Sequence, residues 1–251
     1  MEVLVCLKRV PMVGGRISLL ASEREIDTAM LGFTVSPHEE CAVEEAVRIV
    51  EAVGGRVTVL SLGPPEAAEQ LRDAVALGAS RCLLLEAGEK EWGPMATAAA
   101  IAAAAAAEGP FDLLLFGNEA ADTGDFQVGV RVAHLLGLPV ATAVKSLSLE
   151  GERAVARREY RGVEESFALA LPAVVSVKEG INLPRYPSLP GRMRAKKAEI
   201  ERLSPQFTAE GLSMVRLVVP RAERRRAEVL GEGAAAVGRL LEVIESAGLL
   251  S

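Results

Sequence analysis

The residues best suited to hold an anion lie in the segment Gly117 to Gly129, GNEAADTGDFQVG. Gly117 and Gly124 permit tight backbone turns, and a helix that begins at Asp125 directs free backbone N–H groups towards a negative charge placed before it. This arrangement predicts a phosphate held by the backbone. An ordinary polar loop between a strand and a helix has a similar composition, so both interpretations stand on this segment alone.

A second distinctive segment, residues 178 to 202, combines proline with positive charge. Pro184, Pro187 and Pro190 recur at every third position and remove three backbone donors, which argues against a regular helix or a central strand. We expect an exposed, stiff loop in which Leu189 stands among basic side chains and meets an acidic protein surface. A leucine tucked inward beside solvated charges is the alternative. The basic residues are Arg185, Arg192, Arg194, Lys196 and Lys197.

The sequence lacks the motifs of several classes of enzyme. There is no G-x-G-x-x-G and no Walker A sequence, which argues against a dinucleotide dehydrogenase and a P-loop phosphotransferase. The three cysteines, Cys6, Cys41 and Cys82, have no C-x-x-C spacing, and the chain has only two histidines. A disulfide framework and a zinc site are therefore not expected, and we assign no metal ligand.

Short apolar runs alternate with helical patterns over the first 140 residues or so, and this order predicts a parallel sheet with right-handed crossovers. The helix at Pro37 has a capping box, with Ser36 before it and Glu39 as its partner. The predicted strands are Val3 to Leu7, Arg56 to Ser61, Cys82 to Glu86 and Asp112 to Phe116. The predicted helices are Pro37 to Val53, Pro65 to Leu77, Pro94 to Ala107 and Asp125 to Leu136.

Strand-like runs without intervening helices follow, and we expect them to extend the sheet as antiparallel partners. They are Val144 to Leu149, Ala154 to Glu159, Ser166 to Leu171 and Ala173 to Lys178. The predicted fold class is α/β, an open, mostly parallel twisted sheet with helices on both faces, extended by antiparallel strands and followed by a C-terminal arm. Ligands of such sheets bind beyond the carboxyl ends of the strands. Loops expected there include Cys6 to Val10, Ser61 to Pro64 and Gly117 to Gly129.

Composition indicates which broad class of protein this is. The 251 residues are 50% hydrophobic, with a mean hydropathy of +0.25, which suits a large buried core. A net charge of −6 argues against general nucleic-acid binding. The apolar run Ala96 to Ala107 has about half the length needed to span a bilayer, so we expect no membrane insertion. The start of the sequence lacks the pattern of a secretory signal, and we expect a cytoplasmic protein.

Ordered motifs along most of the chain resemble the β subunits of electron transfer flavoproteins. Asn182 to Lys197 matches the family's recognition loop, N-x-P-R-Y-x-x-L-P-x-x-M-x-A-K-K. The other matching segments are Leu7 to Pro11, Ser36 to Ala46, Gly63 to Ala74, Arg158 to Gly162 and Leu171 to Val175. The resemblance implies a sheet like that of the adenine nucleotide alpha hydrolases. It also implies a nucleotide-binding domain of residues 1–203, with the recognition loop at 177–199, and an arm of residues 204–251 that contacts an α subunit.

The resemblance also implies site residues. AMP, a structural nucleotide, would contact Cys6, Ser36, Pro37, His38, Glu39, Leu62, Gly117, Asn118, Glu119, Ala120, Ala121, Asp122, Thr123, Gly124, Asp125, Phe126, Gln127 and Val128. Met12 and Val13 would lie near the FAD, which the α subunit mainly holds. Tyr186, Leu189, Pro190, Met193, Arg194, Lys196 and Lys197 would dock a dehydrogenase, with Leu189 as the anchor. Ser36, Glu119, Phe126 and Val128 depart from the family's usual residues at their positions.

The implied function is that of an electron carrier subunit without bond-making chemistry and without catalytic residues. Electrons would enter the FAD from acyl-CoA and related dehydrogenases of fatty acid β-oxidation and leave to a membrane quinone oxidoreductase. One alternative is an electron-bifurcating relative with a second FAD in place of AMP. Two others are a nucleotide-binding module like the universal stress proteins and an ATP pyrophosphatase-type ligase, whose phosphate loops are not visible here.

Overall fold

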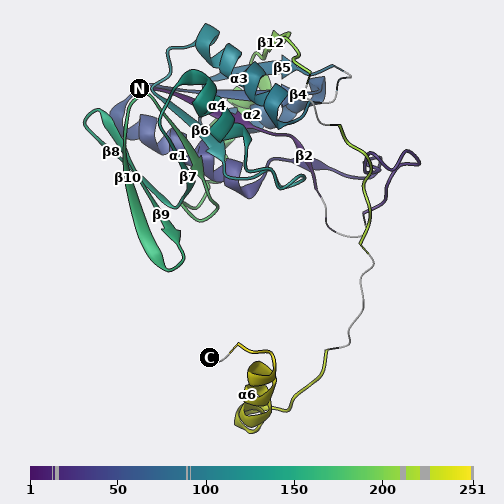
Figure 1. Ribbon diagram of the computed structural model, residues 1–251. Helices are drawn as coiled ribbons and strands as arrows, with labels where there is room; N and C mark the ends of the chain where they lie inside the picture. The colour runs from purple at the N-terminus through teal and green to yellow at the C-terminus, as the bar shows by residue number, and fades with distance from the viewer. Residues whose placement is uncertain are drawn as a thin grey trace. The chain divides into compact units, whose positions relative to one another are not determined.

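The computed structural model of the chain describes residues 1–12, 14, 17–88, 90, 92–209, 213–220 and 227–249 (Figure 1). The chain forms two compact units, Met1–Arg216 and Leu217–Ser251. Within the described ranges, no helix combines the length and the apolar character that crossing a lipid bilayer requires.

The first unit contains a parallel sheet of seven strands, in the order β12-β5-β4-β1-β6-β11-β7. The four strands predicted near the N-terminus are confirmed, and so is their parallel pairing. The strands are β1 Glu2–Leu7, β4 Arg56–Gly63, β5 Arg81–Glu86, β6 Leu113–Gly117, β7 Val140–Val144, β11 Ala173–Val177 and β12 Glu201–Leu203. The sequence predicted the fold class correctly.

Side chains of the central strands pack alternately on the two faces of the sheet, as the period of a strand requires. Val3 and Val5 of β1 pack with buried residues of α1 and α2 on one face. Leu4 and Cys6 pack with the alanine-rich α3 and with α4 on the other face. The helices are α1 Pro37–Val53, α2 Ala68–Leu77, α3 Pro94–Glu108, α4 Val128–Leu136 and α5 Leu189–Lys197, with a 3₁₀ turn at Pro65–Ala67 before α2.

The structure corrects the predicted start of α4. Asp125 to Gln127 are not helical, and the helix begins at Val128. Gly124 has a φ of +64° and its N–H donates to the carbonyl of Ala120 at 2.8 Å, so a tight turn ends just before Asp125 and residues 125–127 connect it to the helix. The free N–H groups of this helix therefore belong to its start at Val128.

The antiparallel strands are confirmed, but they form a sheet of their own beside β7 (Figure 1). The predicted strand Val144 to Leu149 is divided, because β7 of the parallel sheet ends at Val144 and β8 begins at Ser146. Ala173–Val177, predicted as antiparallel, pairs in parallel with β6 and β7. The antiparallel strands are β8 Ser146–Glu150, β9 Arg153–Tyr160 and β10 Val163–Ala170, and β2 Val10–Pro11 pairs with β3 Phe33–Thr34.

The prediction of an irregular loop for residues 177–199 is wrong in its second half, because Leu189–Lys197 forms α5. Ser188 caps this helix by accepting a hydrogen bond from the N–H of Gly191 at 3.1 Å. Pro190 is compatible with the helix because it stands in the first turn, where its missing N–H has no intrahelical partner. The buried face of α5 packs on α2.

The second unit contains the 3₁₀ turn Gly233–Ala236 and helix α6 Val237–Ser246. Apolar side chains of α6 are exposed in this unit, among them Leu240, Leu241 and Val243.

Gly191 permits the close approach of α5 to α2, and this gives a test of the packing. A Cβ at position 191 would lie 2.2 Å from the carbonyl oxygen of Ala76, which is backbone and cannot rotate away. We expect Gly191→Ala to lower the free energy of unfolding by about 1 to 3 kcal/mol, as overpacking does, measured by urea denaturation. Gly238→Ala is the matched control, since a Cβ at that helical glycine meets nothing within 4 Å. Equal stability of the two variants would contradict the packing.

Candidate functional site

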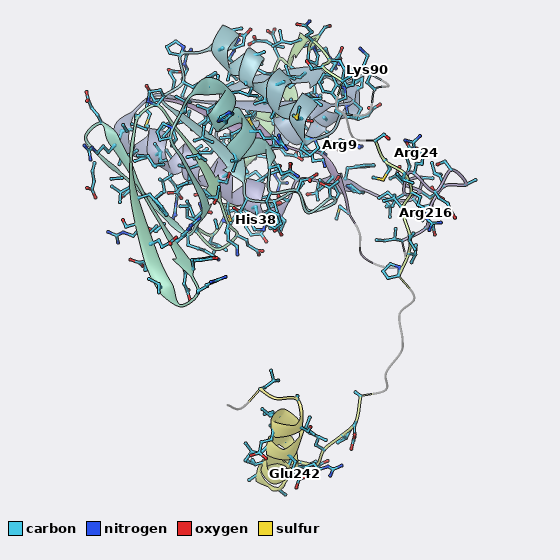
Figure 2. The ribbon with its side chains drawn as sticks, in the orientation of Figure 1. Arg9, Arg24, His38, Lys90, Arg216 and Glu242 are labelled. Carbon is cyan, nitrogen blue, oxygen red and sulfur yellow. The ribbon has the colours of Figure 1, made fainter. Side chains whose placement is uncertain are left out.

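A cavity of about 970 Å³ lies beyond the carboxyl ends of β1, β4 and β6. The loops after these strands supply much of its wall, namely Cys6–Arg9, Leu62–Pro64 and Gly117–Ala120. Arg9 and Lys90, which are labelled in Figure 2, also line it. This is the edge of an open parallel sheet where ligands bind, and where the three distinctive loops were expected.

Glycine lets the end of β6 approach the neighbouring elements. A Cβ at Gly117 would lie 2.7 Å from Cγ of Glu39, so α1 packs directly on the strand end. A Cβ at Gly129 would lie 2.7 Å from Oγ of Ser176, which brings the start of α4 against β11. Both glycines line the cavity.

Glu39 joins α1 to the loop after β1. One of its carboxylate oxygens accepts a hydrogen bond from the N–H of Lys8 at 2.9 Å, and the other accepts one from the N–H of Ser36 at 3.1 Å. Ser36 in turn caps the helix by accepting from the N–H of Glu39, which confirms the predicted capping box. The carboxyl group is thus a buried part of the cavity wall that orients two backbone segments.

Burial sets the electrostatics of this wall. Desolvation raises the pKa of Glu39 from its ordinary value of 4.5 to about 8, although the hydrogen bonds from Ser36 and Lys8 act in the opposite direction. Burial also raises the pKa of the Cys6 thiol, and the nearby Glu39 adds to that effect. Cys6 is therefore an inert packing residue of the cavity, since a reactive cysteine needs a lowered pKa.

Polar side chains fix the loop that follows β6. Lys8 Nζ forms an ion pair with Asp122 at 2.8 Å, and His38 Nε2 lies 3.5 Å from a carboxylate oxygen of Glu119. The side-chain oxygen of Asn118 accepts a hydrogen bond from the N–H of Ala143 at 2.7 Å. These contacts hold the loop by its side chains and leave its backbone to form the wall.

Helices α3 and α4 both begin at the cavity, and the start of α4 has no side-chain cap. Gln127 precedes α4, and its side chain does not bond the first turn of the helix. Pro94 and Val128, the first residues of these helices, line the cavity. The N–H groups of an uncapped first turn are natural partners for an anion.

The far end of the cavity is aromatic. The rings of Trp92 and Phe207 meet edge to face, with centroids 5.1 Å apart, and Lys90 Nζ lies 4.8 Å from the Phe207 centroid. Trp92 Nε1 donates to the carbonyl of Ala87 at 2.7 Å, which fixes the indole. Sequence reasoning missed this end. The available signal was the single tryptophan of the chain, placed just before the Gly93-Pro94 helix start.

The structure brings many of the predicted nucleotide contacts together. Those that line the cavity are Cys6, Glu39, Leu62, Gly117, Asn118, Glu119, Ala120, Thr123, Asp125, Phe126 and Val128. Described residues of the prediction that lie outside the lining are Ser36, Pro37, His38, Ala121, Asp122, Gly124 and Gln127. For the predicted flavin contacts, Met12 is exposed and Val13 lies outside the described residues.

The predicted docking residues lie on and just before α5. The Leu189 side chain is 75% exposed at the start of the helix, and Tyr186, Pro190 and Met193 are also exposed. Arg194, Lys196 and Lys197 stand in the last turn, where positive charge suits the helix dipole. Arg185, by contrast, does not surround Leu189 as predicted, because it forms ion pairs with Glu44 and Glu51 of α1.

The fold and the cavity define an α/β protein with a ligand-sized site at the carboxyl edge of a parallel sheet. Residues 26–207 match the model of the electron transfer flavoprotein domain. The chain is 36% identical to the human electron transfer flavoprotein subunit beta over 209 residues, which is 82% of each chain. It is 34% identical to the Bacillus subtilis subunit beta over 204 residues, or 81% of this chain and 79% of that one.

A third relative, the subunit beta of Syntrophomonas wolfei, is 31% identical over 243 residues, which is 96% of this chain and 95% of that one. The chain therefore belongs to the electron transfer flavoprotein family as a β subunit, and the resemblance seen in the motifs is confirmed. Such a subunit is part of an electron carrier rather than an enzyme, and it implies a flavin and an α subunit as partner.

The raised pKa of Glu39 makes stability depend on pH. Between about 4.5 and about 8, the folded chain keeps a proton on Glu39 that the unfolded chain has released. The free energy of unfolding should therefore fall by about 1.4 kcal/mol per pH unit through this window because of this one group. We expect Glu39→Gln to remove that slope in urea denaturation across the window. Exposed Glu150→Gln is the control, and parallel curves for Glu39→Gln and the unmodified protein would contradict the assignment.

Proposed function

We propose that this β subunit binds AMP as a structural nucleotide in the cavity, supports the FAD that its α subunit mainly holds, and docks dehydrogenases through α5. Acyl-CoA and related dehydrogenases of fatty acid β-oxidation are the donors, a membrane quinone oxidoreductase is the acceptor, and the cytoplasm is the place of action. FAD supplies the redox chemistry. The residues of this chain bind the nucleotide, help to orient the FAD and dock the dehydrogenase.

The observation that carries the nucleotide proposal is the convergence of the uncapped start of α4 with basic side chains on one cavity. Val128 begins this helix, and Lys8, Arg9 and Lys90 line the same space. A phosphate monoester needs N–H donors and positive charge, and both are present. Leu62, Ile101 and Phe116 supply apolar wall for a base. The residues present therefore fit AMP.

The size of the cavity favours a second candidate ligand, an FAD molecule in place of AMP. Small-ligand sites have volumes of roughly 300 to 1,000 Å³, and this cavity is near the upper limit. Trp92 and Phe207 also supply aromatic wall in this cavity. A second FAD in place of AMP, as proposed for an electron-bifurcating subunit, would use that wall.

The docking proposal depends on the two faces of α5. Gly191 and Ala195 are buried on one side, whereas Leu189 and Met193 are exposed on the other, beside three basic residues of the last turn. Burial of one leucine provides about 1.5 to 3 kcal/mol, which suits transient contact with several donors. The positive charge suits an acidic rim around the partner's pocket.

The arm, residues 204–251, is proposed to contact the α subunit. The apolar side chains Leu240, Leu241 and Val243 of α6 are exposed in the second unit taken by itself. An amphipathic helix of this kind buries its apolar face against a partner.

Leu189→Ala tests the docking proposal. We expect the flavin spectrum and the heterodimer to remain unchanged, while electron acceptance from an acyl-CoA dehydrogenase slows by roughly tenfold to a hundredfold at limiting carrier concentration. Stopped-flow reduction of the flavin measures the rate. Val163→Ala is the control, because Val163 is also exposed but lies on β10, outside residues 177–199. Equal rates for Leu189→Ala and the control would remove the anchor role.

Counting nucleotides tests the cavity proposal. We expect extraction of the purified heterodimer to release one AMP and one FAD, and excess AMP to raise the melting temperature of the nucleotide-free protein. At a hundred times the dissociation constant the gain in stability is about 2.7 kcal/mol. Two FAD molecules without AMP would establish the second candidate instead. Release of no adenine nucleotide, together with an unchanged melting temperature, would contradict both.

A further inference from the structure

Arg185 binds two carboxylates of α1 at once. Its Nε and Nη2 donate to the two oxygens of Glu44 at 2.9 and 3.1 Å, and Nη1 and Nη2 donate to Glu51 at 2.7 and 2.9 Å. Its backbone N–H also donates to Glu44, at 3.1 Å. Both the side chain and the main chain at position 185 are therefore tied to the same helix.

Asn182 adds a second attachment three residues earlier. Its side-chain amide donates to the carbonyl of Cys41 at 3.0 Å and to a carboxylate oxygen of Glu45 at 2.8 Å. Ala42, Val43 and Ala46 of the same helix are buried in the core. The segment that leads into α5 is thus held against an element that cannot move independently.

Neutralising Glu44 does not require Arg185. The Glu44 side chain is only 4% exposed, but Arg48 already lies 3.2 Å from it, one turn further along α1. What Arg185 adds is a bridge between Glu44 and the half-exposed Glu51, and a planar guanidinium holds such a bridge in one geometry. Pro184 and Pro187 flank the bridge and restrict the same backbone.

We infer that Arg185 is a positioning residue for partner docking: by bridging Glu44 and Glu51 it holds residues 182–188 on α1 and presents Leu189, four positions later, in its docking orientation. This inference rests on the proposed docking function. A peptide segment ordered before it binds loses less conformational entropy on contact than a free one. The effect falls on recognition of the donor, and the flavin and the nucleotide cavity are not involved.

A double-mutant cycle tests the inference on the intact heterodimer, with an acyl-CoA dehydrogenase and its acyl-CoA substrate as electron donor. We expect Arg185→Gln to raise the KM of the dehydrogenase for the carrier by roughly threefold to tenfold, the cost of freeing one or two ordered side chains, with kcat nearly unchanged. Because Arg185 acts through Leu189, the double variant with Leu189→Ala should lose no more than Leu189→Ala alone. Arg185→Lys should restore part of the loss, because lysine keeps the charge but lacks the planar fork.

Two further variants separate positioning from general stability. Arg48→Gln removes another cation from Glu44 without touching the segment 182–188, and it should leave KM unchanged. Glu51→Gln removes one end of the bridge at a side chain that is 56% exposed, so this variant should fold normally. It should raise KM, as Arg185→Gln does. Amide hydrogen exchange of residues 183–189 should accelerate in Arg185→Gln and Glu51→Gln only.

Additive losses in the double variant, or an unchanged KM together with unchanged exchange in Arg185→Gln, would overturn the inference. Failure of the docking function itself gives a different result. In that case Leu189→Ala has no effect on KM, while exchange at residues 183–189 still accelerates in Arg185→Gln.

Discussion

The burial of carboxylates along α1 is the constraint on which much of the first unit depends. Glu39, Glu44 and Glu45 are buried, and a buried acid destabilises the fold unless hydrogen bonds or ions compensate it. The partners come from other segments of the chain, from Lys8 after β1 and from Asn182 and Arg185 before α5. One helix therefore joins the cavity wall to the proposed docking segment.

Helix α5, the proposed docking helix, combines a rigid base with an exposed apolar surface. The small residues Gly191 and Ala195 let α5 lie close to α2, so the helix is seated by backbone contact rather than by long side chains. Leu189 and Met193 are left to face solvent. The proposed docking role requires release of each donor after transfer, and a few exposed apolar side chains on a fixed helix suit weak, repeated contact.

Local patterns predicted much of the fold correctly. The capping box at Ser36 and Glu39 was recognisable because both of its hydrogen bonds lie within four residues. The four strands predicted near the N-terminus were recognisable because two-sided burial makes them mostly apolar. The helix at Leu189 was missed, because prolines three residues apart argue against a helix unless the last one falls in a first turn. The start of α4 was placed too early, because a turn at Gly124 and a helix start have similar residues.

The sequence by itself determined the alternation of strands and helices and the family, and it supplied the residues of the proposed docking segment, since each depends on periodicity or on ordered motifs. Only the tertiary structure decided that Arg185 bridges α1, with Glu44 141 positions away, and that Phe207 meets Trp92 at the end of the cavity. A charge run or an isolated aromatic residue has the same local signature whether it is solvated or paired. Its partner is set by how distant elements pack, and that information is spread over the whole chain.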